Sequence, residues 1–236
     1  TDSLKLDYTH KELDFIDFNI QNLLPFKLSE LGPGMSTGDI NADGFLDIYV
    51  CNAGSIQGDN QKNELFINNG NNTFTEKADQ FNLADTGITT HAAFFDYDKD
   101  GDLDCYILNN SFIPVSSLNY SNKRELRDKD WEVNPILKGG GDRLMRNDNG
   151  KFVDVSESAG IYGSLIGFGL GVTVGDVNND LYPDIYISND FYERDYLYIN
   201  NKNGTFSEQI QTWATHLSQS SMGADMADIN NDGKAD

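Results

Sequence analysis

The sequence predicts an all-β fold built from repeated units of four antiparallel strands. One nine-residue pattern of oxygen-bearing side chains occurs four times in the 236 residues. A short run of small residues precedes each copy, and a β-branched or aromatic run follows the first three copies. Two more β-type runs, separated by a turn rich in Asn and Gly, complete each of these three units. Four strands per unit, repeated along the chain, are the organisation of a β-propeller blade.

The repeated pattern is an acidic loop with oxygen side chains at positions one, three, five and nine. Calcium takes about six to eight oxygen ligands, and a short loop with this spacing can wrap around it. We therefore predict four Ca²⁺ loops, with the seventh residue included among the ligands. The predicted metal ligands are Asp39, Asn41, Asp43, Phe45 and Asp47; Asp96, Asp98, Asp100, Asp102 and Asp104; Asp176, Asn178, Asp180, Tyr182 and Asp184; and Asp228, Asn230, Asp232, Lys234 and Asp236.

An EF-hand begins with the same spacing, so the residues that follow must distinguish the two. An EF-hand needs a bidentate Glu at position twelve and a helix on each side. The twelfth positions of the first three loops are Val50, Ile107 and Ile187. The residues after position nine are β-branched and aromatic, which favours strands. The loops are therefore predicted to join two strands.

The sixth position of each loop predicts that the sites are unequal. The chain turns sharply there with a positive φ, which glycine adopts most easily. Gly44, Gly101 and Gly233 fit this requirement, whereas the third loop has Leu181. The second loop carries an extra carboxylate, Asp102, so its acidic side chains repel one another without an ion. We expect the second loop to bind most tightly, or to be the most disordered without metal, and the third to be weakest.

Each unit has four predicted strands placed around its loop. Tyr49, Tyr106 and Tyr186 share one position in the second strand and are expected to pack between blades. An entry segment over residues 1–25 is expected to precede the blades of residues 26–236. The predicted first strands are 34–38, 91–95, 171–175 and 223–227; the second are 48–50, 105–107 and 185–187; the third are 63–69, 142–147 and 194–200; and the fourth are 72–76, 150–154 and 204–208.

The second unit contains an insertion over residues 110–141. Its part from Leu118 to Trp131 is locally basic and compatible with a helix, in a chain that is strongly acidic elsewhere. Insertions between blade strands map to loops on one face, which is often the binding face. Tyr120, Arg127 and Trp131 are therefore candidate contact residues, and a structural flap is the alternative.

The formal net charge of −21 limits the partners. Nucleic acid and anionic lipid both attract basic surfaces, so neither is expected as a ligand. Fourteen of the 38 acidic residues lie in the four loops, where bound calcium would offset part of the charge. Cys51 and Cys105 occupy different repeat positions and are expected to be unpaired thiols. The sequence has no membrane span and no signal peptide, so a mature or excised piece is expected.

Three features resemble a known family. They are the four loops, the run Gly167-Phe-Gly169 before Val172 to Asp176, and the segment from Asn147 to Gly160. Together they resemble the FG-GAP or VCBS repeats of integrin-α-like β-propellers, especially bacterial proteins grouped with cartilage acidic protein. The resemblance implies calcium as the cofactor and a location outside the cell or at its surface, with the exterior of a bacterial outer membrane as the expected place. Such propellers commonly have about seven blades, so about three complete blades and the start of a fourth are expected here, with the rest of a parent chain completing the propeller.

The expected function is recognition or adhesion, with a protein or glycan ligand and no direct insertion into a membrane. The sequence has no Gly-x-Ser-x-Gly elbow, His-Glu-x-x-His pair or phosphate-binding glycine loop. His91 and Asp225 lie on predicted innermost strands, where a satisfied polar role is favoured over catalysis. Two alternatives stay open: part of a polysaccharide-degrading enzyme of the lyase type, which would need a base near a calcium ion, and a structural spacer.

Overall fold

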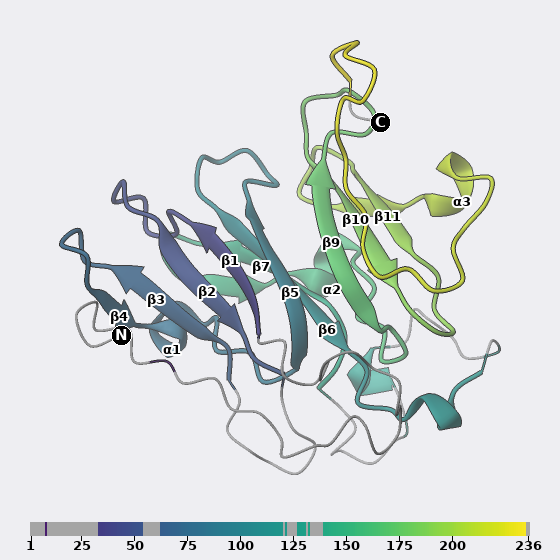
Figure 1. The fold of residues 1–236 in the computed structure, drawn as a ribbon, viewed down its shortest axis with the longest axis horizontal. Coiled ribbons are helices and arrows are strands. Elements are labelled where there is room, and N and C mark those ends of the chain that lie inside the picture. Colours follow the sequence, from purple (N-terminus) through teal and green to yellow (C-terminus); the bar gives the residue numbers. More distant parts are fainter. Residues whose placement is uncertain are drawn as a thin grey trace, which may run out of the picture.

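The computed structural model describes residues 8, 33–53, 62–119, 121, 127–130, 132 and 139–234. These residues form an all-β fold of three four-stranded antiparallel sheets with short helices (Figure 1). The predicted fold class is confirmed. The predicted entry segment apart from Tyr8, the candidate contact residues Tyr120 and Trp131, and the last predicted ligand Asp236 lie outside the described residues.

Each sheet is formed by four strands that follow one another in the chain and pair in that order, as in a propeller blade. All twelve strands predicted for the first three units overlap an observed strand. The first sheet contains β1 (Gly34–Gly38), β2 (Asp47–Cys51), β3 (Glu64–Asn68) and β4 (Phe74–Glu76); the second contains β5 (Ile88–Phe95), β6 (Asp104–Asn110), β7 (Arg143–Asn147) and β8 (Phe152–Asp154); the third contains β9 (Gly169–Gly175), β10 (Asp184–Asn189), β11 (Tyr196–Asn200) and β12 (Phe206–Glu208).

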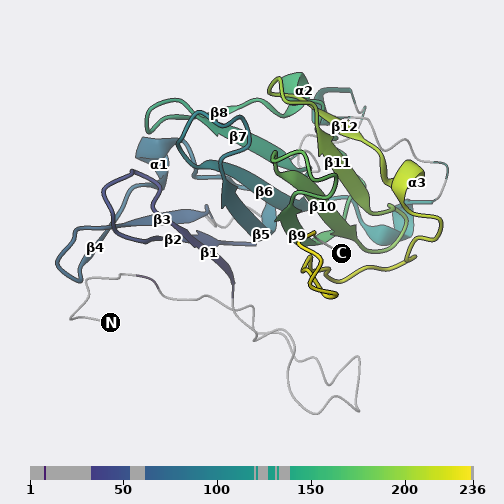
Figure 2. The ribbon, with the colours of Figure 1, turned by 90° about the horizontal axis from the view of Figure 1, so that it is seen from above.

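The first strands of the three sheets lie side by side. β1 contacts β5, and β5 contacts β9, while the later strands of each sheet fan outward (Figures 1 and 2). Small residues permit this approach, because a Cβ atom at Gly34 would lie 2.4 Å from the carbonyl oxygen of Thr90. Thr90 also donates its hydroxyl hydrogen to the carbonyl oxygen of Gly169 at 2.6 Å. The small residues that begin each unit therefore serve the contact between blades.

The hydrophobic core lies between neighbouring sheets. One cluster includes Tyr49, Leu65 and Ile107, from the first and second sheets. A second cluster includes Tyr106 and Ile187, from the second and third sheets. Apolar side chains thus project from both faces of the middle sheet. This explains why its strands are nearly continuous apolar runs in the sequence.

The two cysteines are free and buried, as predicted. Cys51 lies on β2 and Cys105 on β6, and both belong to the cluster between the first and second sheets. Burial raises the pKa of the Cys51 thiol to about 12. Both cysteines therefore act as small apolar core residues.

A first strand predicted at 223–227 is wrong, because these residues form no strand. The segment is attached to β9, where the hydroxyl of Thr173 donates to the carbonyl oxygen of Ala224 at 2.7 Å. In the other units, the first strand pairs with the strand after the loop. No residue in the described part of the chain supplies that partner here, so no antiparallel ladder forms.

Three short α-helices of the described residues were not predicted; two 3-10 helices, η4 (Val115–Ser117) and η5 (Asp128–Asp130), lie in the insertion of the second unit. The α-helices are α1 (Ala78–Phe81), α2 (Ser156–Ala159) and α3 (Ile210–Trp213), and each follows the fourth strand of its unit. A single helical turn has no periodic signature in the sequence and is unstable without tertiary packing. Here each turn begins with a buried residue that docks onto its own sheet.

Candidate metal loops

All four acidic loops fold in the same way. The carboxylate at position one accepts backbone N–H groups from positions five and six, at 2.7–3.2 Å. The carboxylate at position five accepts the N–H of position seven, at 2.9–3.1 Å. Each carboxylate oxygen has further lone pairs, so these bonds leave acceptor capacity for a cation. The position-one residues are Asp39, Asp96, Asp176 and Asp228, and the position-five residues are Asp43, Asp100, Asp180 and Asp232.

The aspartate at position nine anchors each of the first three loops to its sheet. Asp47, Asp104 and Asp184 are fully buried. One oxygen accepts the N–H of the residue at position two, at 2.9–3.1 Å. The other oxygen accepts the N–H of an asparagine at the end of the third strand, at 2.8 Å in each unit. These asparagines, which sequence reasoning did not single out, are Asn68, Asn147 and Asn200.

The second loop brings several predicted ligands together. Asp96, Asp98 and Asp104 each place a carboxylate oxygen within 4.8 Å of the other two. Desolvation, followed by the charges of neighbouring aspartates, raises the pKa of Asp102 to about 6. Desolvation also raises the pKa of Asp104 to about 7, although two backbone hydrogen bonds oppose it. The cluster thus holds more negative charge than its own hydrogen bonds can compensate.

Buried oxygens at the third position fit a hard cation. Oδ1 of Asp98 and Oδ1 of Asn178 are buried without a hydrogen-bond partner among the described residues, and Oδ1 of Asp102 is in the same state. Buried acceptors of this kind are uncommon because losing water without a replacement is unfavourable. An all-oxygen donor set suits Ca²⁺ rather than a soft metal. The donor set of the second and third loops therefore fits the predicted ion.

The first loop differs at its third position, and the fourth is described only in part. Asn41 donates its amide hydrogen to Oδ2 of Asp43 at 2.8 Å, so these two predicted ligands are joined to each other. In the fourth loop, Asn230 accepts the N–H of Asp232 at 2.9 Å, and Lys234 ends the described residues. Both loops keep the common fold at their first and fifth positions.

The sixth position has the positive φ that the sequence predicts. Gly44, Gly101 and Gly233 have φ values of 89°, 100° and 86°, and Leu181 has 71°. A left-handed conformation costs a non-glycine residue about 1–2 kcal/mol. The Leu181 side chain is 77% exposed, so packing does not offset that cost. The third loop therefore carries local backbone strain.

Replacing Leu181 with glycine is expected to stabilise the protein by about 0.5–1 kcal/mol, the strain relieved less the entropy that glycine adds to the unfolded chain. The measurement is urea unfolding in saturating calcium. Gly44→Ala is the matched reverse change, because a Cβ atom there meets nothing within 4 Å and only the φ preference is altered. It should destabilise by a similar amount, and a destabilised Leu181→Gly variant would contradict the strain.

The repeated tyrosines are tied to a polar residue that precedes the third strand. The hydroxyl of Tyr106 donates to Asp142 at 2.9 Å, and that of Tyr186 donates to Asp195 at 2.7 Å. In the first unit, Asn63 donates to the hydroxyl of Tyr49 at 3.0 Å. The same polar residue also accepts a backbone N–H at the end of the second strand. Tyr49 and Tyr106 pack between blades as predicted. Tyr186 instead packs within the third unit, against residues of β11 and α3. The polar partners of all three tyrosines were missed.

The candidate contact residue Arg127 is engaged within the molecule. Its guanidinium donates to the carbonyl oxygen of Ile161. Nearby, Lys129 pairs with Glu157 of α2 at 2.6 Å. This part of the insertion is therefore fastened to the second unit, which corresponds to the flap alternative for Arg127.

Two polar residues predicted on innermost strands, His91 and Asp225, are not among the predicted metal ligands. His91 is half-buried on β5, and burial lowers its pKa. Asp225 is exposed in the segment beside β9. No hydrogen bond or ion pair described for the chain joins the two, and their catalytic role stays a hypothesis.

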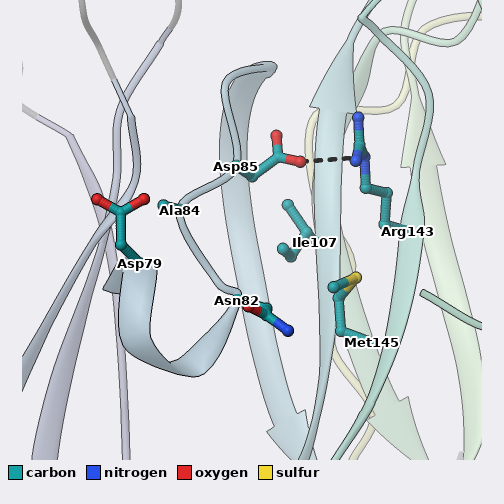
Figure 3. A pocket seen from close by; sticks show the side chains of 7 residues that line it. All are labelled: Asp79, Asn82, Ala84, Asp85, Ile107, Arg143 and Met145. Carbon is teal, nitrogen blue, oxygen red and sulfur yellow. Dashed lines mark ion pairs between the residues drawn. The ribbon is translucent and has the colours of Figure 1, made fainter. Parts of the chain in front are cut away.

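A polar pocket of about 200 Å³ lies between α1, the segment after it, and strands β6 and β7 (Figure 3). The ion pair between Asp85 Oδ2 and Arg143 Nε, at 3.0 Å, crosses it. Asp85 is buried and also accepts the N–H of Gly87 at 2.7 Å. The pair joins the segment after α1 to the second sheet. The lining residues are Asp79, Asn82, Ala84, Asp85, Ile107, Arg143 and Met145.

Comparison with known proteins identifies the repeat. The model of the FG-GAP-like repeat family matches residues 39–107 and 182–236, more than half of the chain. Both matched segments contain or overlap the acidic loops. No curated protein matches the chain. Among the helices of the described residues, none is long and apolar enough to cross a membrane.

Two solved structures are similar in part. An Agrocybe aegerita lectin, described as recognising non-reducing terminal N-acetylglucosamine, is 19% identical with a TM-score of 0.45, covering 87% of this chain and 46% of the lectin. A rhamnogalacturonan lyase of Bacillus licheniformis is 16% identical with a TM-score of 0.38, covering 75% of this chain and 33% of the lyase. The chain thus spans about half of the first structure and a third of the second. At these TM-scores, neither likeness carries an argument about activity.

Proposed function

Because this chain belongs to the FG-GAP-like repeat family, we propose that it is a calcium-binding β-propeller module of an extracellular or surface-anchored protein. One observation carries the proposal: four loops repeat the same hydrogen bonds, and buried oxygens at the third position of two of them have no partner among the described residues. The likeness to integrin-α-like propellers and to bacterial surface proteins grouped with cartilage acidic protein is part of this proposal.

The ion would be held by oxygen atoms that the loops already direct inward. In the second loop these are the carboxylates of Asp96, Asp98 and Asp104. A bound divalent ion supplies positive charge and satisfies oxygens that no N–H reaches. The chain's own residues fix the loop through backbone N–H groups and hold it on the sheet through Asp104. The proposed role of calcium is therefore to stabilise the blade, since no step of a reaction is assigned to it.

A location outside the cytoplasm follows from the affinity class. Oxygen loops of this kind bind calcium with affinities from about micromolar to millimolar and fill where the ion is abundant. The exterior of a bacterial cell meets this condition. The net charge of −21 gives a further reason for an abundant counterion, because self-repulsion opposes a compact state.

Calcium binding is tested by titrating metal-free full-length chain with CaCl₂ in a calorimeter. The wild type is expected to bind, and Asp98→Ala is expected to lose the second-loop ion, because a carboxylate oxygen of Asp98 lies within 4.8 Å of those of Asp96 and Asp104. Asp79→Asn is the matched control, since this exposed carboxylate lies on α1, outside the loops. The proposal fails if the wild type shows neither binding heat nor calcium retained after dialysis.

We further propose that a face of the propeller recognises a protein or glycan. The acidic surface disfavours nucleic acid as the ligand. A glycan array run with and without chelator tests recognition, beside an assay for the ultraviolet absorbance of unsaturated uronate products. Calcium-dependent glycan retention without product supports a binding module. Product formation would instead favour the lyase alternative. A folded protein that gave no signal in either assay would favour a structural spacer.

A further inference from the structure

Lys202 places an ammonium group against the third calcium loop. Its Nζ lies 3.3 Å from Oδ2 of Asp180, the carboxylate at position five of that loop. The Asp180 side chain is 17% exposed and that of Lys202 is 47% exposed, so the pair is partly shielded from water. One predicted calcium ligand of the third loop thus already has a positively charged partner within the chain.

The backbone of Lys202 is hydrogen-bonded to Asn200, the asparagine that joins the third loop to its sheet. Its N–H donates to Oδ1 of Asn200 at 2.8 Å. The N–H of Asn200 in turn donates to Asp184, the buried aspartate at position nine, also at 2.8 Å. Two successive hydrogen bonds therefore hold the backbone of Lys202 beside the loop, within reach of its ammonium.

The aromatic residue of the third loop adds a second attraction for positive charge. Tyr182 occupies position seven, and the Lys202 Nζ lies 5.7 Å from the centre of its ring. The Nζ of Lys99, from position four of the second loop, lies 5.3 Å from the same ring. Both distances are within the range of cation–π attraction. Two ammonium groups therefore lie around the third loop.

The first two units have an uncharged residue where the third has Lys202, two residues after its anchoring asparagine. The corresponding asparagine of the first unit, Asn68, accepts the N–H of Gly70 at 3.0 Å. The turn of the second unit is one residue shorter: Asn147 accepts the N–H of Gly150 at 2.7 Å, and Asn149 is the residue two after Asn147. Neither glycine nor asparagine carries a charge, so this turn position cannot deliver one to the first or second loop. The difference is specific to the third unit.

We propose that Lys202 gives the third loop a resident positive charge, so that this loop keeps its shape without calcium and binds calcium more weakly than the second loop. The inference rests on the proposed calcium binding. The third loop has three carboxylates against five in the second. An ammonium beside Asp180 stabilises the loop without metal, and it repels an incoming divalent ion.

Lys202→Gln tests the inference by calcium titration of the metal-free full-length chain. A unit charge about 5 Å from a divalent ion, in a water-like dielectric, changes binding by about tenfold. The variant is therefore expected to bind calcium at one site about tenfold more tightly than the wild type. Adding Asp180→Asn to this variant should abolish the gain, which assigns it to the third loop. Lys202→Arg keeps the charge and should behave as the wild type.

Lys151→Gln is the matched control. Lys151 lies in the corresponding turn of the second unit, but its ammonium donates to the carbonyl oxygen of Gln80 and not to a loop carboxylate. Its removal should leave calcium affinity unchanged. Equal affinity gains in Lys151→Gln and Lys202→Gln would overturn the inference, because they would reflect general charge instead of a specific position.

Thermal unfolding in chelator gives a second readout. Lys202→Gln should melt below the wild type without calcium and recover with calcium, whereas Lys151→Gln should not show this pattern. If the wild type binds calcium but Lys202→Gln matches it in both affinity and metal-free melting, the inference is wrong while the proposed function stands. If no form of the chain binds calcium, the proposed function itself fails.

Discussion

Removing calcium is expected to lower the melting temperature by about 10–20 °C. An ion that binds only the folded state, present at about a hundred times its Kd, contributes about 2.7 kcal/mol per site. For a chain of this size, 1 kcal/mol shifts the melting temperature by about 2–4 °C. Two occupied loops therefore account for the expected change. The charge of −21, no longer offset by bound ions, acts in the same direction.

Differential scanning calorimetry in CaCl₂ and in chelator, at constant ionic strength, measures this shift. Asp100→Ala should reduce the calcium-induced shift more than Asp180→Ala. The reason is that the third loop is already weakened by the strain at Leu181 and has Lys202 beside Asp180. Equal reductions would contradict the ranking of the loops. An unchanged wild-type melting curve in chelator would contradict stabilisation by calcium altogether.

The Asp142→Asn variant is expected to be more stable than the wild type above pH 7, by up to about 4 kcal/mol. Asp142 is buried, and desolvation raises its pKa to about 7. Each unit of difference between folded and unfolded pKa corresponds to about 1.36 kcal/mol. Because the folded state holds the proton more tightly, the contribution of Asp142 is fully present below about pH 4 and is lost as the pH rises towards 7. The advantage of the variant should therefore disappear at low pH.

The geometry for this exchange already exists in the first unit. Asn63 occupies the position of Asp142, accepts the N–H of Asn52 and donates to Tyr49. Urea unfolding from pH 4 to pH 8 measures the difference between variant and wild type. Asp148→Asn serves as a control, since Arg146 lowers the pKa of this exposed carboxylate and its removal should give no gain at high pH. A variant less stable than the wild type at pH 8 would show that Asp142 is needed as a charged acceptor.

The strands and loops could be predicted because each has a local signature. Position six requires a positive φ, which explains its glycines, and runs of β-branched and aromatic residues mark the strands that follow the loops. Asn68 and Asp142 gave no such signal, because their importance depends on backbone N–H groups and hydroxyls brought close only by folding. The prediction of a first strand in the fourth unit was wrong for a related reason. A strand is defined by its partner, and residues 223–227 have none in the described part of the chain.

The contacts of the insertion in the second unit also could not be predicted from local sequence. Composition marked Arg127 as a surface residue for a partner, but a guanidinium can equally satisfy a carbonyl of its own chain. Its bond to Ile161 could not be read from spacing, because the two residues belong to different segments of the second unit. Sequence reasoning was therefore more accurate for elements that repeat than for this segment, which occurs once.

Most of the aspartates in the acidic loops have a structural role that does not involve metal. Those at positions one and five close the turn, and the one at position nine fastens it to the neighbouring strand, in every unit where all are described. A loop that no longer bound calcium would therefore still need the same aspartates in order to fold. The number of such motifs in a chain is consequently an upper limit on its ion content. The side chain at position three is the better indicator of a loop that binds an ion. It accepts the position-five N–H in the first and fourth loops, but its buried oxygen has no described partner in the second and third.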